Sequence, residues 1–312
     1  MIGAGTAAGV WRRLGRLEMD MRAAAAWAAT HAALPVLEPL DDARWHLYIS
    51  VRDREGRARI GRATFAMEPA PGLSALEPEP ILDLGALGTF DDSGVTSSCI
   101  ARCDRRRYLF YTGWTRGVTV PFYLAAGLAI SDDDGPFRRT SEAPLLERTA
   151  VDPYLTASPF VLVESDRWRM WYVSGSGWDT TDRGPRHRYH LRYAESVDGM
   201  TWHRPGTVCL DYGSPEEHAF ARPCVLQDRG TYRMWFASRG DRYRIGCAES
   251  NDGLRWTRLP DECGLQPSIE GWDSQMVEYP FVFEWRERRY MLYNGNQYGR
   301  TGIGLAIWEQ AA

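Results

Sequence analysis

Acidic residues recur at one position of a unit that is repeated along this 312-residue chain. Six or seven residues before the proline (or Ser98) of a predicted first strand, an acid stands in four of five units. These acids are Asp91 and Asp92, Asp152, Glu216 and Glu217, and Asp273. Acids are common in turns, where some simply cap strands. Four equivalent acids around one axis would nevertheless form a shared polar pocket, and a protonated carboxyl beside an ionised one is what cleavage of a glycosidic bond requires.

The elements that must position these acids are indicated by a second repeat. Five short segments end in Ala, at residues 59–63, 126–129, 191–194, 245–248 and 303–306, and all but 191–194 read small-x-Ala. Their final alanines are 66, 65, 54 and 58 residues apart. Several short strands per unit at this period predict the blades of a β-propeller. A propeller brings one loop from every blade to one end of its channel, so distant acids can share a site.

Each unit contains the pattern of four strands. The first surrounds Pro-aromatic-Val, the second is rich in Met, Trp and Tyr, the third carries the alanine, and the fourth follows a turn. Asp-Gly pairs at 134–135, 198–199 and 252–253 favour tight turns with positive φ between the third and fourth strands.

The last unit lacks a fourth strand, which would leave an open edge. Residues 10–13, Val-Trp-Arg-Arg, have the missing pattern. We therefore predict an all-β, five-bladed propeller that forms a single domain over residues 1–312. Its N-terminal strand, near residues 10–17, is expected to complete the last blade.

Composition excludes some classes of partner. The net charge is −4 and the arginines are scattered, so we expect no nucleic-acid partner. No apolar run approaches the roughly 18 residues of a membrane span, so we expect no membrane partner. The first residues lack the order of a secretory signal, which favours a cytoplasmic protein. The 13 Trp and 15 Tyr suit strands and can also stack on sugars.

Cysteine and histidine spacing does not indicate a metal centre. Cys99 and Cys103 are four residues apart on one predicted strand, about 13 Å, which is too far for a disulfide. The six cysteines are interpreted as reduced core residues. No tight ligand spacing is present, so we expect no cofactor and no required metal. A divalent cation held by His and Asp at the top of the channel remains an alternative.

At this point the sequence resembles the five-bladed β-propeller glycosidases, the superfamily of arabinanases, β-xylosidases, invertases and levansucrases. The resemblance rests on Asp152-Pro153 before a Ser-Pro-Phe-Val strand, on the Met-Trp-Tyr strands, and on Glu217 before the following blade. It implies that Asp152 is the middle Asp, which orients the acid, and that Glu217 is the general acid. Where the superfamily has its first-blade base or nucleophile, this sequence has Thr30 and His31. His31, or Asp91 or Asp92, is expected to take that place.

The sequence is most similar to a group of propeller proteins found with enzymes of polysaccharide and sugar biosynthesis. The matching stretches are residues 90–95, 117–122, 217–223 and 271–274. This likeness favours sugar chemistry and leaves the reaction open.

Further residues are expected to contact a saccharide or a sugar nucleotide because they fall in segments at the mouth of the channel. They are Asp91, Arg222, His218, Asp273, Glu278, His187, His190 and Trp178. Arg52, Arg222 and Arg239 stand at repeat edges and could grip a carboxylate or phosphate of the substrate.

Three functions follow as hypotheses. The first is a carbohydrate-active enzyme that acts on a glycosidic or glycosyl-phosphate bond, with Glu217, Asp152, Asp92 and His31 as catalytic residues. The second is a sugar-binding propeller without hydrolase activity. The third is a biosynthetic transferase, phosphorylase or cyclising enzyme on the same scaffold. The oligomeric state is not indicated.

Overall fold

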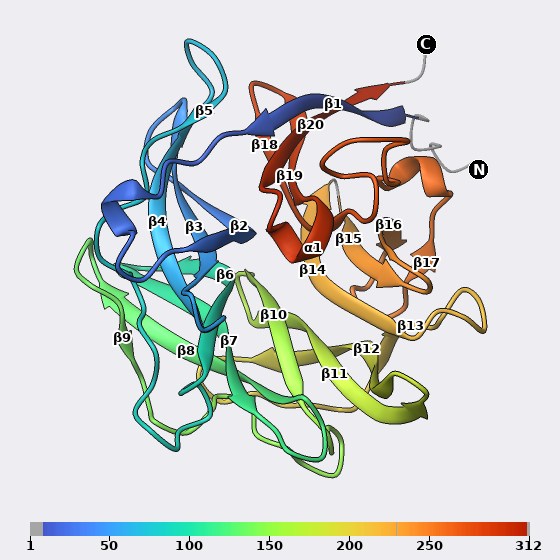
Figure 1. The fold of residues 1–312 in the computed structure, drawn as a ribbon. Coiled ribbons are helices and arrows are strands. Elements are labelled where there is room, and N and C mark those ends of the chain that lie inside the picture. Colours follow the sequence, from blue (N-terminus) through green and yellow to red (C-terminus); the bar gives the residue numbers. More distant parts are fainter. Residues whose placement is uncertain (1–8, 229, 311–312) are drawn as a thin grey trace.

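The computed structural model describes residues 9–228 and 230–310 and shows a five-bladed β-propeller (Figure 1). Each blade is an antiparallel sheet of four strands, and its first strand lies nearest the centre of the ring. The first residues, on which the expectation of a cytoplasmic location depends, lie mostly outside the described part. Within that part, no helix is both long enough and apolar enough to cross a membrane.

The strands follow the predicted order within each blade. Blade 1 contains β2 (Thr30–Pro39), β3 (Arg44–Arg52), β4 (Ala58–Ala66) and β5 (Gly72–Leu73). Blade 2 contains β6 (Gly94–Cys103), β7 (Arg106–Arg116), β8 (Phe122–Asp132) and β9 (Arg138–Arg139). Blade 3 contains β10 (Thr156–Val163), β11 (Trp168–Thr181), β12 (Gly184–Ser196) and β13 (Val208–Leu210).

Blade 4 contains β14 (Ala219–Asp228), β15 (Thr231–Arg239), β16 (Tyr243–Ser250) and β17 (Thr257–Arg258). Blade 5 contains β18 (Glu278–Trp285), β19 (Arg288–Asn294), β20 (Ile303–Gln310) and, as its outermost strand, β1 (Gly9–Leu17). Short helical turns are η1 (Arg22–Ala24), η2 (Asp261–Cys263) and α1 (Asn296–Gly299). A parallel pair, Ala58 with Gly94, joins blades 1 and 2 into one hydrogen-bonded sheet.

The turns between third and fourth strands depend on an Asp side chain. In blade 3, Asp198 Oδ1 accepts from the backbone N–H groups of Met200 and Thr201, and Gly199 has a φ of +71°. The turn of blade 4, around Asp252 and Gly253, repeats this geometry. Blade 2 differs from the prediction because Asp133, rather than the glycine of the Asp-Gly pair, has the positive φ.

The N-terminal strand closes the ring, as predicted. β1 pairs with β20 from Gly9 opposite Gln310 to Leu17 opposite Ile303, and Figure 1 shows the two strands side by side. Trp11 packs edge-on against Trp235 and Trp308, and its Nε1–H donates to the carbonyl oxygen of Cys263 at 3.1 Å. This single side chain therefore joins the last blade to blade 4.

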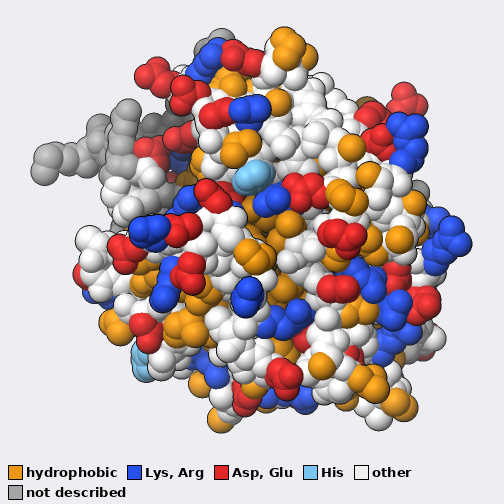
Figure 2. All heavy atoms as spheres, turned by 90° about the vertical axis from the view of Figure 1, so that its left-hand side faces the viewer, with side chains coloured by type: hydrophobic (Ala, Val, Ile, Leu, Met, Phe, Trp, Pro, Cys, Tyr) orange, Lys and Arg blue, Asp and Glu red, His pale blue; other side chains and the backbone are white. Residues whose placement is uncertain are grey.

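The outer surface of the ring carries mixed charge. Figure 2 shows acidic and basic side chains interspersed over the face on the left of Figure 1, with hydrophobic atoms scattered between them. On this face no broad patch of one sign is visible.

We expect replacement of Trp11 by Ala to lower the free energy of unfolding by about 3–5 kcal/mol, because it removes a buried aromatic from the closure of the ring. Val10→Ala is the matched control, since its side chain lies on the same strand and is 49% exposed. Urea denaturation measures both. Equal stability of the two variants would contradict a closing role for Trp11.

Candidate functional site

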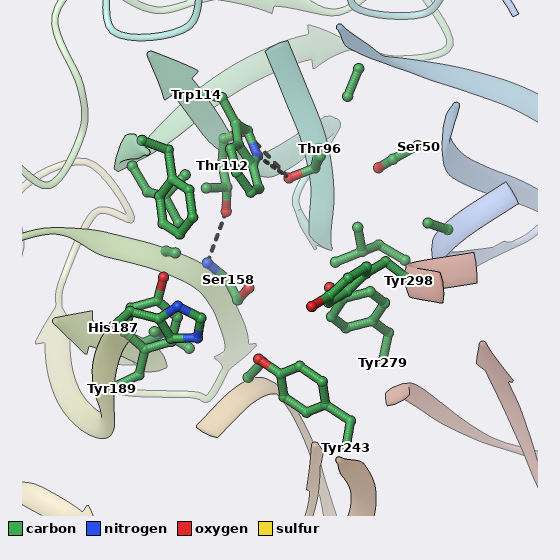
Figure 3. Close-up of a pocket in the computed structure, with 18 of the residues that line it drawn as sticks. Ser50, Thr96, Thr112, Trp114, Ser158, His187, Tyr189, Tyr243, Tyr279 and Tyr298 are labelled. Carbon is green, nitrogen blue, oxygen red and sulfur yellow. Dashed lines mark hydrogen bonds between the residues drawn. The ribbon is translucent and has the colours of Figure 1, made fainter. Parts of the chain in front are cut away.

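A cavity of about 300 Å³ lies on the axis of the ring and is lined by residues of all five blades. Its polar groups include the side chains of Ser50, Thr96, Thr112 and Ser158 (Figure 3). The Thr112 Oγ1 accepts from the backbone N–H of Ser158 at 2.8 Å, which ties blade 2 to blade 3 at the cavity wall. Hydroxyl groups from several blades thus surround one enclosed space.

An irregularity in every first strand decides which residues face this space. The register of each first strand shifts near its middle or its start. In four blades the residue before the strand's proline has a positive φ of 46° to 55°. These four residues are Leu34, Ser158, Arg222 and Tyr279. A bulge of this kind re-aims a side chain, and three of the four line the cavity.

The residue immediately before each of these four is small in blades 1, 3 and 4 and acidic in blade 5. Ala33, Ala157 and Ala221 line the cavity, and the corresponding residue of blade 5 is Glu278. Glu278 is fully buried, and neither of its carboxylate oxygens has a hydrogen-bond partner. Burial raises the pKa of Glu278 well above its ordinary value, against the opposing effects of Arg239, Tyr279 and Arg52.

Arg222 crosses the axis of the ring. Its guanidinium donates to the carbonyl oxygens of Ser97 at 2.6 Å and Pro35 at 2.8 Å, in blades 2 and 1. The side chain is 1% exposed, and burial lowers its pKa to about 10. Arg222, expected from the sequence to bind substrate, is instead an internal tie between three blades.

Aromatic side chains form two walls of the cavity. Trp114 and Phe122 of blade 2 meet Trp178 and His187 of the long β11–β12 hairpin, with Phe122 and Trp178 5.3 Å apart between ring centroids. His187 also stacks on Tyr189 at 4.1 Å. His187 thus lies in the cavity wall, and Trp178, which is not a lining residue, contacts it edge-on at 6.0 Å between ring centroids.

The other wall consists of tyrosines. Figure 3 shows Tyr243, Tyr279 and Tyr298 projecting toward the cavity from the side opposite His187. Tyr298 lies in α1, where both Gln297 and Tyr298 have a positive φ. Such strained backbone is found at ligand sites more often than elsewhere.

Two arginines complete the lining. Arg52 and Arg239 are the last residues of the second strands of blades 1 and 4, and thus flank blade 5 with its Glu278. The guanidinium carbon of Arg239 lies 5.1 Å from the centre of the Tyr243 ring.

The nearby histidines are neutral at pH 7. Burial, followed by the charges of Arg239, His218 and Arg186, lowers the pKa of His187 to about 3. Burial, followed by Arg52 and Arg300, lowers the pKa of His31 to about 4. His31 Nδ1 lies 2.9 Å from the Thr30 hydroxyl, and His31 itself is not among the lining residues.

The recurring acids lie within their own blades. The Tyr172 hydroxyl donates to Asp152 Oδ2 at 2.9 Å, and Arg204 Nη1 donates to the same oxygen at 2.8 Å. Asp91 has the same two kinds of partner, a second-strand tyrosine at 3.0 Å and an arginine of the fourth strand at 2.8 Å. Asp273 repeats the arrangement with Tyr293 and with Arg13 of β1. In these three blades the period therefore reflects a buried contact between the acid, a tyrosine and an arginine.

Glu217 is a variant of this contact. Blade 4 has Phe236 in place of the tyrosine, and the Ser238 hydroxyl donates to Glu217 Oε1 instead. Arg258 Nη2 donates to Glu217 Oε2 at 2.5 Å. Neither Glu217 nor Asp152 lines the central cavity.

The expectation that Asp92, Asp152, Glu217 and Asp273 meet across the channel therefore does not match the geometry. Asp92 bonds only within its own loop, to the Gly88 N–H and the Ser93 hydroxyl. The physical reason is that the bulged residues nearer the axis, and not the loop acids, fill the space between the first strands.

The remaining expected residues lie beside the cavity. His218 is buried, and its Nδ1 lies 3.2 Å from the Glu216 carbonyl oxygen. His190 stacks on Tyr212 with ring centroids 4.4 Å apart. Within residues 9–228 and 230–310, no group of three or more His, Cys, Asp or Glu side chains is arranged to hold a metal ion.

The sequence analysis did not identify the three tyrosines of the second cavity wall or the Ser and Thr hydroxyl groups that surround the cavity. The sequence did carry a signal for Tyr279. The two residues before the first-strand proline are Ala-Leu, Ala-Ser and Ala-Arg in blades 1, 3 and 4, and only blade 5 has Glu-Tyr there. Tyr243 and Tyr298 carry no such signal, since they depend on how loops fold over the channel.

The fold and this axial cavity define the class of protein: a five-bladed β-propeller with a ligand-sized central pocket. No protein-family model matches the sequence. Two curated proteins of Mycobacterium tuberculosis, "Uncharacterized protein MT1551" (strain CDC 1551 / Oshkosh) and "Uncharacterized protein Rv1502" (strain ATCC 25618 / H37Rv), are each 42% identical to it over 305 residues. The match covers 96% of this chain and 99% of each relative. The protein belongs to the family of these mycobacterial proteins.

Solved structures share the fold at low sequence identity. One described as "Glycoside hydrolase" has a TM-score of 0.73 at 15% identity, covering 96% of this chain and 92% of its own. A member of a family described as mannoside phosphorylases that contains glycoside hydrolases has 0.71 at 15%, covering 98% and 95%. A thermostable family-43 glycoside hydrolase has 0.68 at 15%, covering 90% of each chain. The predicted five-bladed propeller of the glycosidase superfamily is thus confirmed as a fold.

We expect Asp152→Asn to lower the free energy of unfolding by about 3 kcal/mol or more, because it leaves the Arg204 charge without its buried partner. Asp92→Asn is the control and should change stability by less than about 1 kcal/mol, as it affects one loop. Chemical denaturation compares them. Wild-type stability of Asp152→Asn would argue against a structural role.

Stability should also depend on the neutral histidines. An unfolded histidine has a pKa near 6.5, and His187 and His31 have lowered values of about 3 and 4 in the folded protein, so the unfolded state carries more protons below pH 6.5. The free energy of unfolding should therefore fall as the pH decreases from about 6.5 to 4. His187→Asn should make this decrease shallower in denaturation curves across that range, whereas identical slopes would contradict a neutral buried His187.

Proposed function

We propose that this protein is a carbohydrate-active enzyme that binds a saccharide in the central cavity and uses Glu278 as its proton donor. The observation that carries the proposal is a buried, unpartnered carboxyl at a position whose equivalents in three other blades line that cavity. The low-identity likeness to structures described as glycoside hydrolases supports the fold on which the proposal rests.

The cavity has the composition that sugar binding needs. Ligand sites are concave and mainly apolar, with a few placed polar groups. Aromatic faces such as those of Trp114 and Tyr298 can pack on the apolar faces of a sugar ring, and Tyr hydroxyls provide a polar end. Ser50, Thr96 and Thr112 can donate to and accept from sugar hydroxyls.

Glu278 suits the role of general acid because burial raises its pKa, which favours the protonated form. As the bond between the sugar carbon and the leaving oxygen breaks, its electron pair stays on that oxygen, which takes the Glu278 proton. An acceptor oxygen forms the new bond to the same carbon and releases its proton to water, from which Glu278 regains one. A carboxyl with a raised pKa can perform this step at neutral pH.

We favour transfer of the sugar to an acceptor over a hydrolysis that uses a pair of carboxylates. The described residues that line the cavity include no Asp or Glu that could activate water or attack carbon. In a transferase or phosphorylase the second substrate brings its own reactive oxygen, so such a carboxylate is not needed. A sugar-binding propeller without turnover is the second candidate, and the same absence favours it.

Other expectations remain predictions. Catalytic roles for Asp92, Asp152, Glu217 and His31, a role in polysaccharide biosynthesis, and a cytoplasmic location are among them, as is a single domain over residues 1–312. The proposal gives the acid role to Glu278 because its equivalents in three other blades line the cavity, whereas the equivalents of Glu217 and Asp152 do not.

We expect Glu278→Gln to abolish turnover while the saccharide still binds, because the amide keeps the shape but cannot donate the proton. Turnover by the wild type should persist at neutral pH and fall at alkaline pH, as Glu278 ionises above its raised pKa. A screen of nitrophenyl glycosides, sugar phosphates and nucleotide sugars, with product detection, measures this.

A second readout does not depend on knowing the substrate. Because the folded protein holds the Glu278 proton above the unfolded pKa of about 4.3, wild-type stability should decline as the pH rises through neutral, and Glu278→Gln should decline less. Full activity of Glu278→Gln would overturn the acid role. Binding without product for every donor and acceptor would support the sugar-binding candidate.

A further inference from the structure

Two arginines in the cavity wall lack a carboxylate partner. Neither Arg52 nor Arg239 has a carboxylate oxygen within 4.0 Å among residues 9–228 and 230–310. By contrast, the arginines of the buried blade contacts all reach a carboxylate at 2.5 to 2.8 Å. Those arginines are Arg13, Arg139, Arg204 and Arg258.

Both arginines are held in place by the fold. Arg52 pairs with Thr30 and Ala58 at the end of β3, and Arg239 pairs with Ala219 and Tyr243 at the end of β15. They occupy the same position in blades 1 and 4, on the two sides of blade 5. Because strand ends and an aromatic ring position them, a ligand would lose little entropy in ordering them.

The positive charge reaches the inside of the site. Arg52 lowers the pKa of His31 and Arg239 lowers that of His187, in both cases after the larger effect of burial. Neither arginine forms an ion pair within 4.0 Å with Glu278, the buried acid of blade 5, whose carboxyl oxygens have no hydrogen-bond partner. Arg222 adds a further guanidinium, fully buried, that is bonded to backbone carbonyls and to no carboxylate among the described residues.

From this geometry we infer that the saccharide of the proposed function carries an acidic group, which binds in the cavity between Arg52 and Arg239. The inference rests on the proposed function and specifies its substrate class. A carboxylate of a uronic acid and a phosphate of a sugar phosphate present the same chemistry to two guanidinium groups. The cavity of about 300 Å³ lies at the lower end of the usual range for ligand sites, which indicates a small ligand.

The test compares matched sugars by isothermal titration calorimetry. Glucose, galactose and mannose are titrated as the neutral hexose, the uronate and the 6-phosphate, with inorganic phosphate as a sugar-free probe. We expect at least one acidic form to bind about 10- to 100-fold more tightly than its neutral parent, the range of one charge-assisted hydrogen bond. The uronate and phosphate arms distinguish the two sources of charge.

Variants separate this preference from general effects. Arg52→Gln and Arg239→Gln should each reduce the preference for the acidic form about 10-fold or more. Arg138→Gln, on the exposed part of β9, is the matched control and should retain the wild-type preference. Thermal unfolding verifies that each variant folds.

The outcomes distinguish the two proposals. Equal affinity for neutral and acidic sugars, or a preference that survives in both variants, would overturn the acidic subsite and leave sugar binding intact. Arginine-dependent binding of inorganic phosphate without binding of any sugar would support the subsite and overturn the saccharide function. No binding of any probe would overturn both.

Discussion

The bulge in the first strand of each blade is the constraint on which the site depends. The first strands of the five blades converge on one axis, and the space between them cannot hold large side chains along its whole length. The left-handed residue before each strand proline turns one side chain toward the axis, and the fold assigns these positions to Leu34, Ser158, Arg222 and Tyr279. Arg222 fills the axis and ties three blades, while the residues above it enclose the cavity.

Charge is divided between two levels of the molecule. In the outer level, loop acids pair with tyrosines and arginines, so their charges are neutralised within each blade. At the axis the balance is reversed, because two guanidinium groups line the cavity and none of the described lining residues is acidic. A site that is cationic and aromatic within a protein of net charge −4 arises from this separation.

The neighbours in fold and the relatives in sequence answer different questions. The mycobacterial proteins at 42% identity establish the family, and the solved glycosidase-like structures at 15% establish only the architecture. The chemistry therefore has to come from the cavity itself. The absence of Asp and Glu from the described residues that line the cavity separates this protein from the two-carboxylate scheme that its sequence resemblance implies.

The sequence by itself determined the blades, their strand order and the strand that closes the ring, because alternation, turn residues and a regular repeat are local properties. It also identified acids at equivalent positions, such as Asp152 and Asp273. Only the tertiary structure decided which way those acids face, since a repeat in sequence can mark a shared contact within each blade as readily as a shared site. The pocket residues Tyr243 and Tyr298 likewise depend on the packing of five blades around one axis, where side chains from distant parts of the sequence compete for the same space.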